Sequence, residues 1–292
     1  MIIVRLYGGL GNQLFQYSFG YSLAKKLNQD FLIDIGEFEV LSKNTKRRYG
    51  LKNYKISSKT LSSQNIKNYK IAKISPLYKV LRKSLNYLPL GTLGYFREKA
   101  SEYQPNIQGN RSSGYFDGYW QSFKYFNDFR KDLTKEFVPK EFNQQNNQLK
   151  NEILKTNSVS LHIRRGDFVS DKETNKFHGL CSLDYYYRAI KDLESQDNNL
   201  FFYVFSDEPK WAKKSLKIDF PTQIVDINGE RNPENDLHLM SHCKHHIIAN
   251  STFSWWGAWL AERKGKRVYA PKFWTSKKRA TEDLILPLWK VI

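Results

Sequence analysis

The chain has 292 residues, of which 40% are hydrophobic and 15% aromatic, and these values predict a globular protein with room for two α/β domains. The formal net charge is +18, and the two cysteines, Cys181 and Cys243, indicate neither a zinc site nor a disulfide framework. Because the chain has no signal peptide and no run of about 18 apolar residues, we expect a cytoplasmic protein without a membrane span.

The first forty residues predict a β-α-β unit, with strands at 2–7 and 31–35 and a helix at 13–27. The "GGLGN" turn between them places glycines before a helix N-terminus, where backbone N–H groups favour an anion. It is not a G-x-G-x-x-G fingerprint, because Leu14 stands where the third glycine would be. The glycines alone therefore favour a tight β-to-α turn, and Asn12 is either a helix cap or a donor group for a ligand.

The segment 43–90 carries 13 Lys and Arg residues and no Asp or Glu. It is either a solvated, lysine-rich face or a docking surface for a polyanion such as nucleic acid, acidic lipid or a phosphorylated small molecule. Within it, residues 76–88 fit an amphipathic helix. Residues 114–126 are aromatic and punctuated by turns, and residues 140–157 form either a helix or a linker.

The second half alternates strand and helix patterns more clearly than the first. The expected strands and helices, in chain order, cover residues 159–163, 183–196, 200–206, 209–217, 222–227, 234–243, 245–250, 253–265 and 267–271. Strands separated by helices predict a mostly parallel sheet covered on both faces. We therefore expect two Rossmann-like α/β domains, residues 1–155 and 156–292, with a cleft between them.

The stretch "HIRRGD" ends one of these strands, at the edge where parallel sheets bind ligands. Side chains alternate along a strand, so His162 and Arg164 share a face, and a guanidinium fork suits phosphate oxygens. Arg164 is thus the natural diphosphate ligand. The alternatives are a core histidine for His162, a structural ion pair for Arg165, and a salt bridge or turn cap for Asp167.

A third polar group follows the strand at 245–250. Residues 250–254, "NSTFS", open a helix and predict a second anion cradle made of hydroxyls and backbone N–H groups. Trp255, Trp256 and Trp259 favour packing of that helix on the sheet. His238 and His242 are four residues apart, but no H-E-x-x-H motif is present, and the chain has no D-x-D triplet for a metal-bound diphosphate. We therefore expect no metal.

Three motifs in order, "GGLGNQLFQYSFG", "HIRRGDF" and "NSTFSWWGAWL", resemble glycosyltransferase family 11, the α1,2-fucosyltransferases of bacterial type. The resemblance covers almost the whole chain and is least specific over residues 43–110. It implies a GT-B fold in which the C-terminal domain holds the donor and the N-terminal domain faces the acceptor. It also implies GDP-β-L-fucose as donor substrate, inversion at the anomeric carbon, and neither a metal nor a separate cofactor.

The resemblance also assigns roles to residues of this chain. It places Arg164 on the β-phosphate, His162 near the guanine and Asp236 of "DLHLMS" on the guanine edge. The remaining donor contacts that it implies are Gly11, Asn12, Asn250, Ser251, Thr252 and Ser254. Arg164 is the expected stabiliser of the departing diphosphate. The base is open: Asp167 and His178 are candidates, and a phosphate oxygen or water is the alternative, as is a purely structural pairing of Asp167 with an arginine.

The expected acceptor is the 2-hydroxyl of a terminal galactose or N-acetylgalactosamine, in synthesis of a surface glycan such as O-antigen. The basic segment 43–90 then suits peripheral docking on the anionic inner face of the plasma membrane, where lipid-diphosphate-linked oligosaccharide is presented. Three alternatives stay open: a transferase of another linkage or another GDP-sugar, a basic nucleic-acid-binding protein, and a non-catalytic sugar-binding module. No helix-turn-helix, zinc or RNP signature is present, so we expect no nucleic-acid partner.

Overall fold

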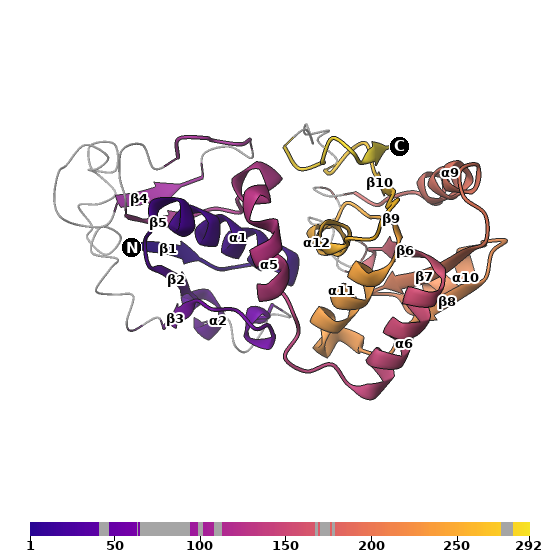
Figure 1. Cartoon of the computed structure of the whole chain (residues 1–292), viewed down its shortest axis with the longest axis horizontal. Coiled ribbons are helices and arrows are strands. Elements are labelled where there is room, and N and C mark those ends of the chain that lie inside the picture. Colours follow the sequence, from indigo (N-terminus) through magenta and orange to yellow (C-terminus); the bar gives the residue numbers. More distant parts are fainter. Residues whose placement is uncertain are drawn as a thin grey trace. The chain divides into compact units, whose positions relative to one another are not determined.

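The computed structural model describes residues 1–40, 47–62, 64, 94–98, 102–107, 113–166, 169, 176, 179–275 and 283–292 (Figure 1). The chain divides into two compact units, Met1–Phe137 and Val138–Ile292. Each unit contains a parallel sheet, which confirms the α/β class. The boundary expected at 155/156 lies one helix later than this division.

The first unit contains a five-stranded parallel sheet with the order β3-β2-β1-β5-β4. Its strands are β1 (Ile2–Arg5), β2 (Phe31–Asp34), β3 (Lys59–Leu61), β4 (Gly94–Arg97) and β5 (Gly114–Asp117). Ile2 lies opposite Phe31 on one side and Gly114 on the other, so β1 is the central strand. The chain builds outward from β1 through β2 and β3 and then returns to the other side, so the order reverses between β1 and β5.

Helix α1 (Leu10–Leu27) packs on one face of this sheet, and residues 10–24 are almost all buried. Gly20 marks the closest approach, because a Cβ atom there would lie 2.5 Å from Val4 Cγ2. The opposite face carries Ile3, Leu61 and Tyr115. The unit's other helices are α2 (Gly36–Val40), α5 (Arg130–Glu136) and the short 3-10 helices η1 (Leu51–Asn53), η4 (Phe123–Tyr125) and η5 (Asn127–Phe129).

The second unit contains a six-stranded parallel sheet with the order β11-β10-β9-β6-β7-β8. Its strands are β6 (Asn157–Ile163), β7 (Leu200–Ser206), β8 (Thr222–Val225), β9 (His245–Ile247), β10 (Val268–Ala270) and β11 (Lys290–Val291). Its helices are α6 (Gln144–Lys155), α9 (Leu183–Glu194), α10 (Pro209–Ser215), η6 (Gly229–Arg231), α11 (Pro233–His242) and α12 (Thr252–Leu260). The order reverses between β6 and β9.

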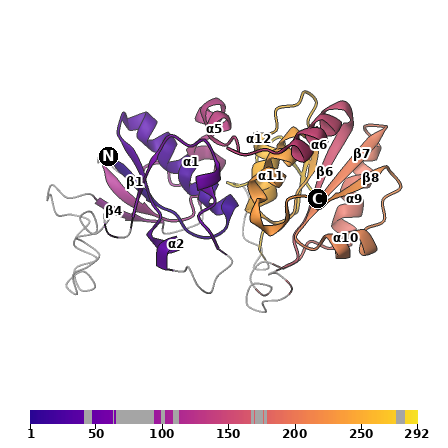
Figure 2. The same cartoon turned by 90° about the horizontal axis from the view of Figure 1, so that it is seen from below.

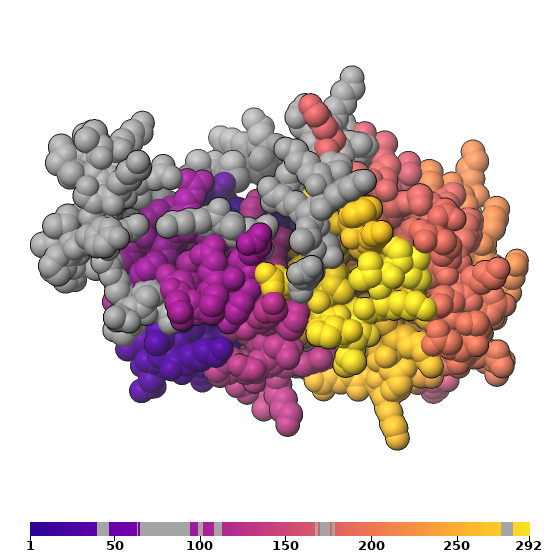
Figure 3. Space-filling view, turned by 90° about the horizontal axis from the view of Figure 1, so that it is seen from above, coloured from indigo at the N-terminus to yellow at the C-terminus, as the bar shows by residue number. Residues whose placement is uncertain are grey.

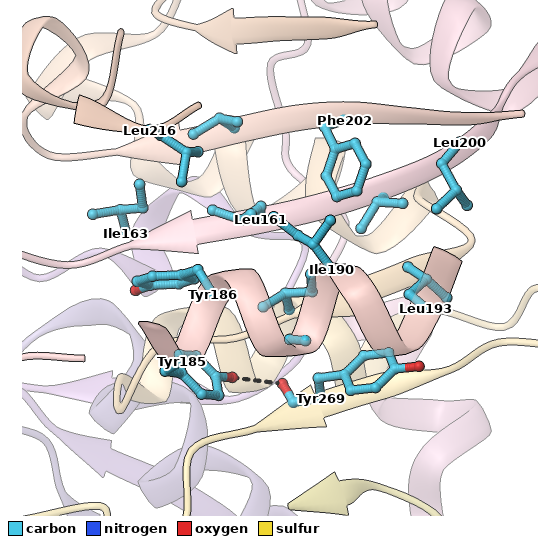
Figure 4. Close-up of a cluster of buried hydrophobic side chains, with 14 of the residues drawn as sticks. Leu161, Ile163, Tyr185, Tyr186, Ile190, Leu193, Leu200, Phe202, Leu216 and Tyr269 are labelled. Atoms are coloured by element: carbon cyan, nitrogen blue, oxygen red, sulfur yellow. Dashed lines mark hydrogen bonds between the residues drawn. The ribbon is translucent and has the colours of Figure 1, made fainter. Parts of the chain in front are cut away.

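Alternation along β6 separates the two faces of this sheet. Val159, Leu161 and Ile163 point into a core formed with α9 and α10, in which Tyr185 donates a 3.1 Å hydrogen bond to the carbonyl oxygen of Tyr269 (Figure 4). The opposite core joins β7 and β8 to α6 and α11 and includes the fully buried Ile153. Figure 2 shows β6, β7 and β8 side by side, with α6 on one side of them and α9 and α10 on the other.

The C-terminal segment completes the far edge of this sheet. Strand β11 pairs with β10, and Lys290 forms a 2.6 Å ion pair with Asp192 of α9. Figure 3 shows this segment in yellow on the surface, beside the salmon residues of α9.

The predicted strands and helices of the second half are confirmed, with shorter strands at β8, β9 and β10. Residues 140–157 prove to be mainly a helix, α6, and Trp255, Trp256 and Trp259 are fully buried as predicted. Residues 114–126 contain strand β5, which the aromatic, turn-rich pattern did not indicate. The helix expected at 76–88 lies outside the described residues. No helix among the described residues is long and apolar enough to cross a membrane.

Candidate active site

The topology of the second sheet indicates one edge of the sheet as the place where a ligand would bind. In open parallel sheets, ligands bind outside the carboxyl ends of the strands where the strand order reverses. Here the order reverses between β6 and β9, whose residues Leu161 and Ile247 are paired. The loops beginning at Arg164 and Ile248 therefore leave adjacent strands at the same edge. Three of the predicted groups, "HIRRG" (162–166), "NSTFS" and the start of α11, lie at this edge.

Arg164 is anchored at this edge by an acidic residue that follows the neighbouring strand. Its Nη1 atom lies 3.0 Å from Oδ2 of Asp207, which directly follows β7, and 27% of the Arg164 side chain is exposed. The pair is partly desolvated, so the carboxylate orients the guanidinium more strongly than a surface ion pair would. Asp207 also accepts a 2.9 Å hydrogen bond from the backbone N–H of Arg165.

The next two residues, Arg165 and Gly166, make close contacts within the protein. Arg165 Nε lies 3.0 Å from Oε2 of Glu208, and its guanidinium stacks 3.8 Å from the ring centroid of Trp211. Arg165 thus has the structural ion pair that was its alternative role. Gly166 passes so close to Asp207 that a Cβ atom would lie 2.7 Å from Oδ2. A side chain at 166 would displace the carboxylate that positions Arg164.

His162 is a buried, neutral residue on the face of β6 opposite to Leu161. It is 4% exposed and its ring centroid lies 5.6 Å from that of Phe253. Burial, with a further contribution from the charge of Arg164, lowers the pKa of His162 to about 3. Its Nδ1 atom has no hydrogen-bond partner among the described residues. A buried polar atom without a partner is costly, so this atom is a candidate ligand contact.

The start of α12 presents backbone N–H groups at the same edge. Ser251 caps the helix by accepting a 3.3 Å hydrogen bond from the N–H of Phe253, and Thr252 is the first helical residue. Ser254 is buried and donates to the carbonyl oxygen of Ser251 at 3.3 Å. Asn250 is also buried; its amide donates to Gly179 at 3.3 Å. The hydroxyl and amide groups thus shape the loop, and the helix N-terminus supplies a positive dipole end.

Asp236 lies in the first turn of α11, within a polar network. Asn228 donates a 2.7 Å hydrogen bond to Oδ1 of Asp236 and exchanges two further bonds, 2.8 and 2.9 Å, with Asn146 of α6. The pKa of Asp236 is raised to about 7, mainly by burial; the bond from Asn228 opposes this rise, and nearby Asp226 and Glu234 add to it. This carboxyl group therefore changes charge near neutral pH.

The N-terminal motif lies in the other unit. Gly9 is the N-cap of α1, so Asn12, in the first turn, is not the capping residue; its Oδ1 accepts a 2.9 Å bond from Gln121. Gly11 is buried beside it. Gln13 is fully buried and braces the turn through the carbonyl oxygens of Gly8 and Arg48, at 3.0 and 2.8 Å. Much of the motif is therefore engaged in local structure.

The two candidate bases, Asp167 and His178, lie outside the described residues. The rings of His238 and His242 meet edge to face with centroids 4.5 Å apart, and the Nδ1 atom of His242 lies 2.7 Å from the carbonyl oxygen of His238. Among the described residues, no group of three or more His, Cys, Asp or Glu side chains is arranged to hold a metal ion.

Sequence reasoning missed three residues that complete this site. Asp207 and Glu208 orient the two arginines, and Asn228 orients Asp236. Their positions in the sequence could have indicated them. Asp207 and Glu208 directly follow the strand at 200–206, and Asn228 closely follows the strand at 222–225, so all three lie at the same sheet edge as Arg164.

Comparison with known proteins places these features in one family. The model of the family described as Glycosyl transferase family 11 matches residues 1–292. The chain is 37% identical over 277 residues to the alpha-1,2-colitosyltransferase of Escherichia coli, covering 94% of this chain and 92% of that protein. It is 34% identical over 308 residues to the O-antigen biosynthesis glycosyltransferase WbnK of Escherichia coli, covering 95% and 97%.

A solved structure bears on the fold. A mutant of Arabidopsis thaliana FUT1 in complex with GDP is similar with a TM-score of 0.55 at 12% identity, covering 93% of this chain and 70% of that one. The likeness confirms the predicted GT-B-like fold with two Rossmann-like sheets.

Proposed function

The chain belongs to glycosyl transferase family 11, and from this premise we propose that it transfers L-fucose from GDP-β-L-fucose to the 2-hydroxyl of a galactose-type sugar. A glycosyl transfer role is common to the family. The α1,2 linkage is supported by the name of the Escherichia coli colitosyltransferase, and a role in O-antigen synthesis by that of WbnK. A GDP-linked donor is supported by the GDP bound to the structurally similar FUT1 mutant.

In the proposed reaction, the acceptor 2-oxygen attacks the anomeric carbon from the side opposite to GDP. The bond from that carbon to the β-phosphate oxygen breaks, its electron pair stays on GDP, and the β-linked sugar becomes α-linked. Negative charge thus builds on the diphosphate as an oxocarbenium-like state forms. The acceptor proton leaves to a base, for which Asp167 is our first candidate, or to water or phosphate.

The observation that carries the proposal is the anchored Arg164 at the β6/β9 switch point. A guanidinium held 3.0 Å from Asp207 is already oriented, so little reorganisation is needed when charge develops on GDP. The N-terminus of α12 lies on the adjacent strand connection and adds its dipole. Since the chain has no D-x-D triplet, we propose that these groups replace a metal ion.

Asp236 supports guanine as the base. A carboxylate accepts two hydrogen bonds side by side, and guanine presents two adjacent donors, N1–H and the 2-amino group, that adenine does not present together. With Oδ1 of Asp236 held by Asn228 at 2.7 Å, the orientation of the carboxyl group is set in advance. We propose that His162 and Asn12 also contact the nucleotide.

The decisive test is release of GDP from GDP-fucose with a β-galactoside present, in excess EDTA. Arg164→Ala is expected to lower the rate at least about a hundredfold, the loss typical for one transition-state donor. Arg188→Ala is the matched control, because Arg188 is an exposed arginine of α9 that pairs with Asp184 of the same helix. Full activity of Arg164→Ala would contradict the proposal, and so would complete loss of GDP release by the natural chain in EDTA.

A second donor follows from the comparison. Colitose is the 3-deoxy form of L-fucose, and the chain is 37% identical to a colitosyltransferase. GDP-fucose, GDP-colitose and GDP-mannose should therefore be compared at equal concentration. Preference for GDP-colitose would change the sugar and keep the mechanism, whereas preference for GDP-mannose would overturn the choice of a 6-deoxy sugar.

We also propose that the basic segment 43–90, most of which lies outside the described residues, docks on anionic membrane. Sedimentation with vesicles is the test. Stronger binding to anionic than to neutral vesicles, weakened by salt, is expected. Equal binding to both would contradict it.

A further inference from the structure

The first sheet has a switch point of its own, between β1 and β5, where residues other than Gly11 and Asn12 have been given no role. Arg5 ends β1 and Asp117 ends β5. Tyr7 and Tyr119 follow two residues later on each strand connection. These four side chains therefore meet at the carboxyl edge where an open parallel sheet binds its ligand.

The guanidinium of Arg5 at this edge is paired with two carboxylates. Arg5 Nη1 lies 3.3 and 3.4 Å from the two oxygens of Asp117, and Nη2 lies 2.5 Å from Oε2 of Glu37. The Asp117 side chain is 9% exposed, whereas those of Arg5 and Glu37 are 29% and 31% exposed. Arg5 and Glu37 therefore present the accessible polar atoms of this group. Because the positive charge of Arg5 is already neutralised, the pairing suits a neutral ligand with hydroxyl groups better than a phosphate.

An aromatic pair lies next to these polar groups. The ring centroids of Tyr7 and Tyr119 are 4.7 Å apart, and the Arg5 guanidinium lies 5.1 Å from the Tyr7 centroid. Tyr119 is 42% exposed, which is unusual for a large ring in an otherwise packed loop. An exposed ring beside a carboxylate and a guanidinium is the combination that recognises a sugar, whose rings have an apolar C–H face and an edge of hydroxyls.

The loop that carries Tyr119 is held rigidly. Both carboxylate oxygens of Glu98 accept backbone N–H groups, from Tyr119 at 2.6 Å and from Trp120 at 3.1 Å. Trp120 has a left-handed backbone with φ of +54°, a conformation that is unfavourable for a residue with a side chain. Its ring is fully buried and stacks on Phe19 at 4.3 Å. Core packing therefore maintains a strained turn that keeps the Tyr119 ring exposed.

We propose that this edge, made of Arg5, Tyr7, Glu37 and Tyr119, binds the neutral acceptor sugar. Tyr119 stacks on the apolar face of the sugar ring, and Glu37 and Arg5 hydrogen-bond its hydroxyls. The inference rests on the proposed transferase function and assigns the residues that select its acceptor.

The test separates sugar binding from nucleotide binding. Full-length chain with ¹³C-labelled tyrosine is titrated with methyl β-D-galactopyranoside and, in a second sample, with GDP. Tyr7→Phe and Tyr119→Phe assign the two resonances. The affinity variants are Tyr119→Ala and Glu37→Gln. Tyr187→Ala is the matched control, since Tyr187 of α9 is also exposed, at 36%.

The galactoside is expected to shift the Tyr7 and Tyr119 resonances whether or not GDP is bound. Tyr119→Ala should weaken galactoside binding about tenfold through loss of stacking, and Tyr119→Phe should retain it. Glu37→Gln should also weaken it, and Tyr187→Ala should not. GDP affinity should be unchanged in all of them.

Unshifted Tyr7 and Tyr119 resonances at saturating galactoside, or a Tyr119→Ala variant that binds the galactoside as tightly as the natural chain, would overturn the inference. Failure of the proposed function would appear elsewhere, as a chain that does not bind GDP or as an Arg164→Ala variant that binds it normally. The two titrations therefore fail independently.

Discussion

Asp207 and Gly166 position Arg164, and neither of them contacts a substrate in the proposed reaction. Asp207 orients the guanidinium from the end of β7, and Gly166 leaves the space that Asp207 occupies. The glycine in "RRGD" thus has a steric explanation: a methyl group would lie 2.7 Å from a carboxylate oxygen. Distances below 3.0 Å force a neighbour to move, and here the neighbour is the positioning carboxylate.

Gly166→Ala is accordingly expected to weaken GDP binding about tenfold, because a displaced Asp207 misaligns a charge-assisted contact. Isothermal titration calorimetry with GDP measures this effect. Gly265→Ala is the control: Gly265 has φ of +75°, and the nearest atom to a methyl group there would be Lys244 Cε at 3.9 Å, so backbone strain is introduced without a clash. Equal GDP affinities for the natural chain and Gly166→Ala would show that Asp207 has room to adjust.

Asp236 makes a pH-dependent prediction. Burial raises its pKa to about 7, so between its ordinary value and about 7 the folded chain keeps a proton that the unfolded chain loses, and stability falls as pH rises through that window. If the ionised form accepts from guanine, GDP affinity should rise about tenfold between pH 6 and pH 8. Asp236→Asn should remove this rise. The measurement is GDP affinity across this range, and a flat profile for the natural chain would contradict the role.

At the scale of elements, burial on nearly every side determines which residues occupy helix α1. Its residues 10–24 are buried on nearly every side, so its pattern is not a simple apolar stripe. Small residues allow this: Gly20 lets the helix approach Val4 of β1 and Phe31 of β2. The motif "GGLGNQLFQYSFG" therefore combines a turn, a brace made by Gln13 and a close packing contact.

Gly20→Ala tests that contact. Alanine gains about 1 kcal/mol of helix propensity over glycine, but overpacking against Val4 and Phe31 costs about 1–3 kcal/mol. Because a Cβ atom would lie 2.5 Å from Val4 and closer still to Phe31, we expect net destabilisation. Urea unfolding followed by circular dichroism measures it, with Lys25→Ala, exposed on the same helix, expected to change stability by less than about 0.5 kcal/mol. A stabilised Gly20→Ala variant would rule out the clash.

At the scale of the whole molecule, the histidines are distributed unevenly. All six lie in Val138–Ile292. Burial lowers the pKa of His162 and of His238 to about 3 and that of His245 to about 4, and it lowers the pKa of His246 well below its usual range. These histidines are neutral in the folded chain and become protonated in the unfolded chain below about pH 6.5.

These histidines make the stability of the second unit depend on pH. A histidine with a lowered pKa in the folded state stabilises the fold above about pH 6.5, and this contribution is lost as pH falls toward about 3. Each fully buried histidine therefore lowers the free energy of unfolding by roughly 2 kcal/mol when the pH falls from 6.5 to 5. The urea midpoint followed by tryptophan fluorescence should therefore fall between pH 7 and pH 5, since every tryptophan except Trp120 lies in the second unit.

His246→Gln supplies the check on this whole-molecule effect. It should flatten the dependence on pH even if the variant is less stable overall, because one titrating group is removed. An unchanged slope would mean that other groups cause the loss of stability.

The sequence by itself determined the class of the fold, the alternation of strands and helices in the second unit, and the position of "HIRRGD" at a strand end. These features depend on local periodicity and on turn residues, and both are determined by residues close together in the sequence. It also indicated the family, because three motifs recur in order. The sequence did not indicate β5, since its short aromatic run between glycines resembles a turn and it becomes a strand only by pairing with β1.

Only the tertiary structure decided which side chains meet. Asp207 reaches Arg164 because β6 and β7 are neighbours, and Asn228 bonds to Asn146, 82 residues away, because α6 packs near the start of α11. The edge formed by Arg5, Tyr7, Glu37 and Tyr119 likewise exists because β5 returns to lie beside β1. Such contacts depend on strand order, which is settled by the packing free energy of the whole sheet and by no local stretch of the chain.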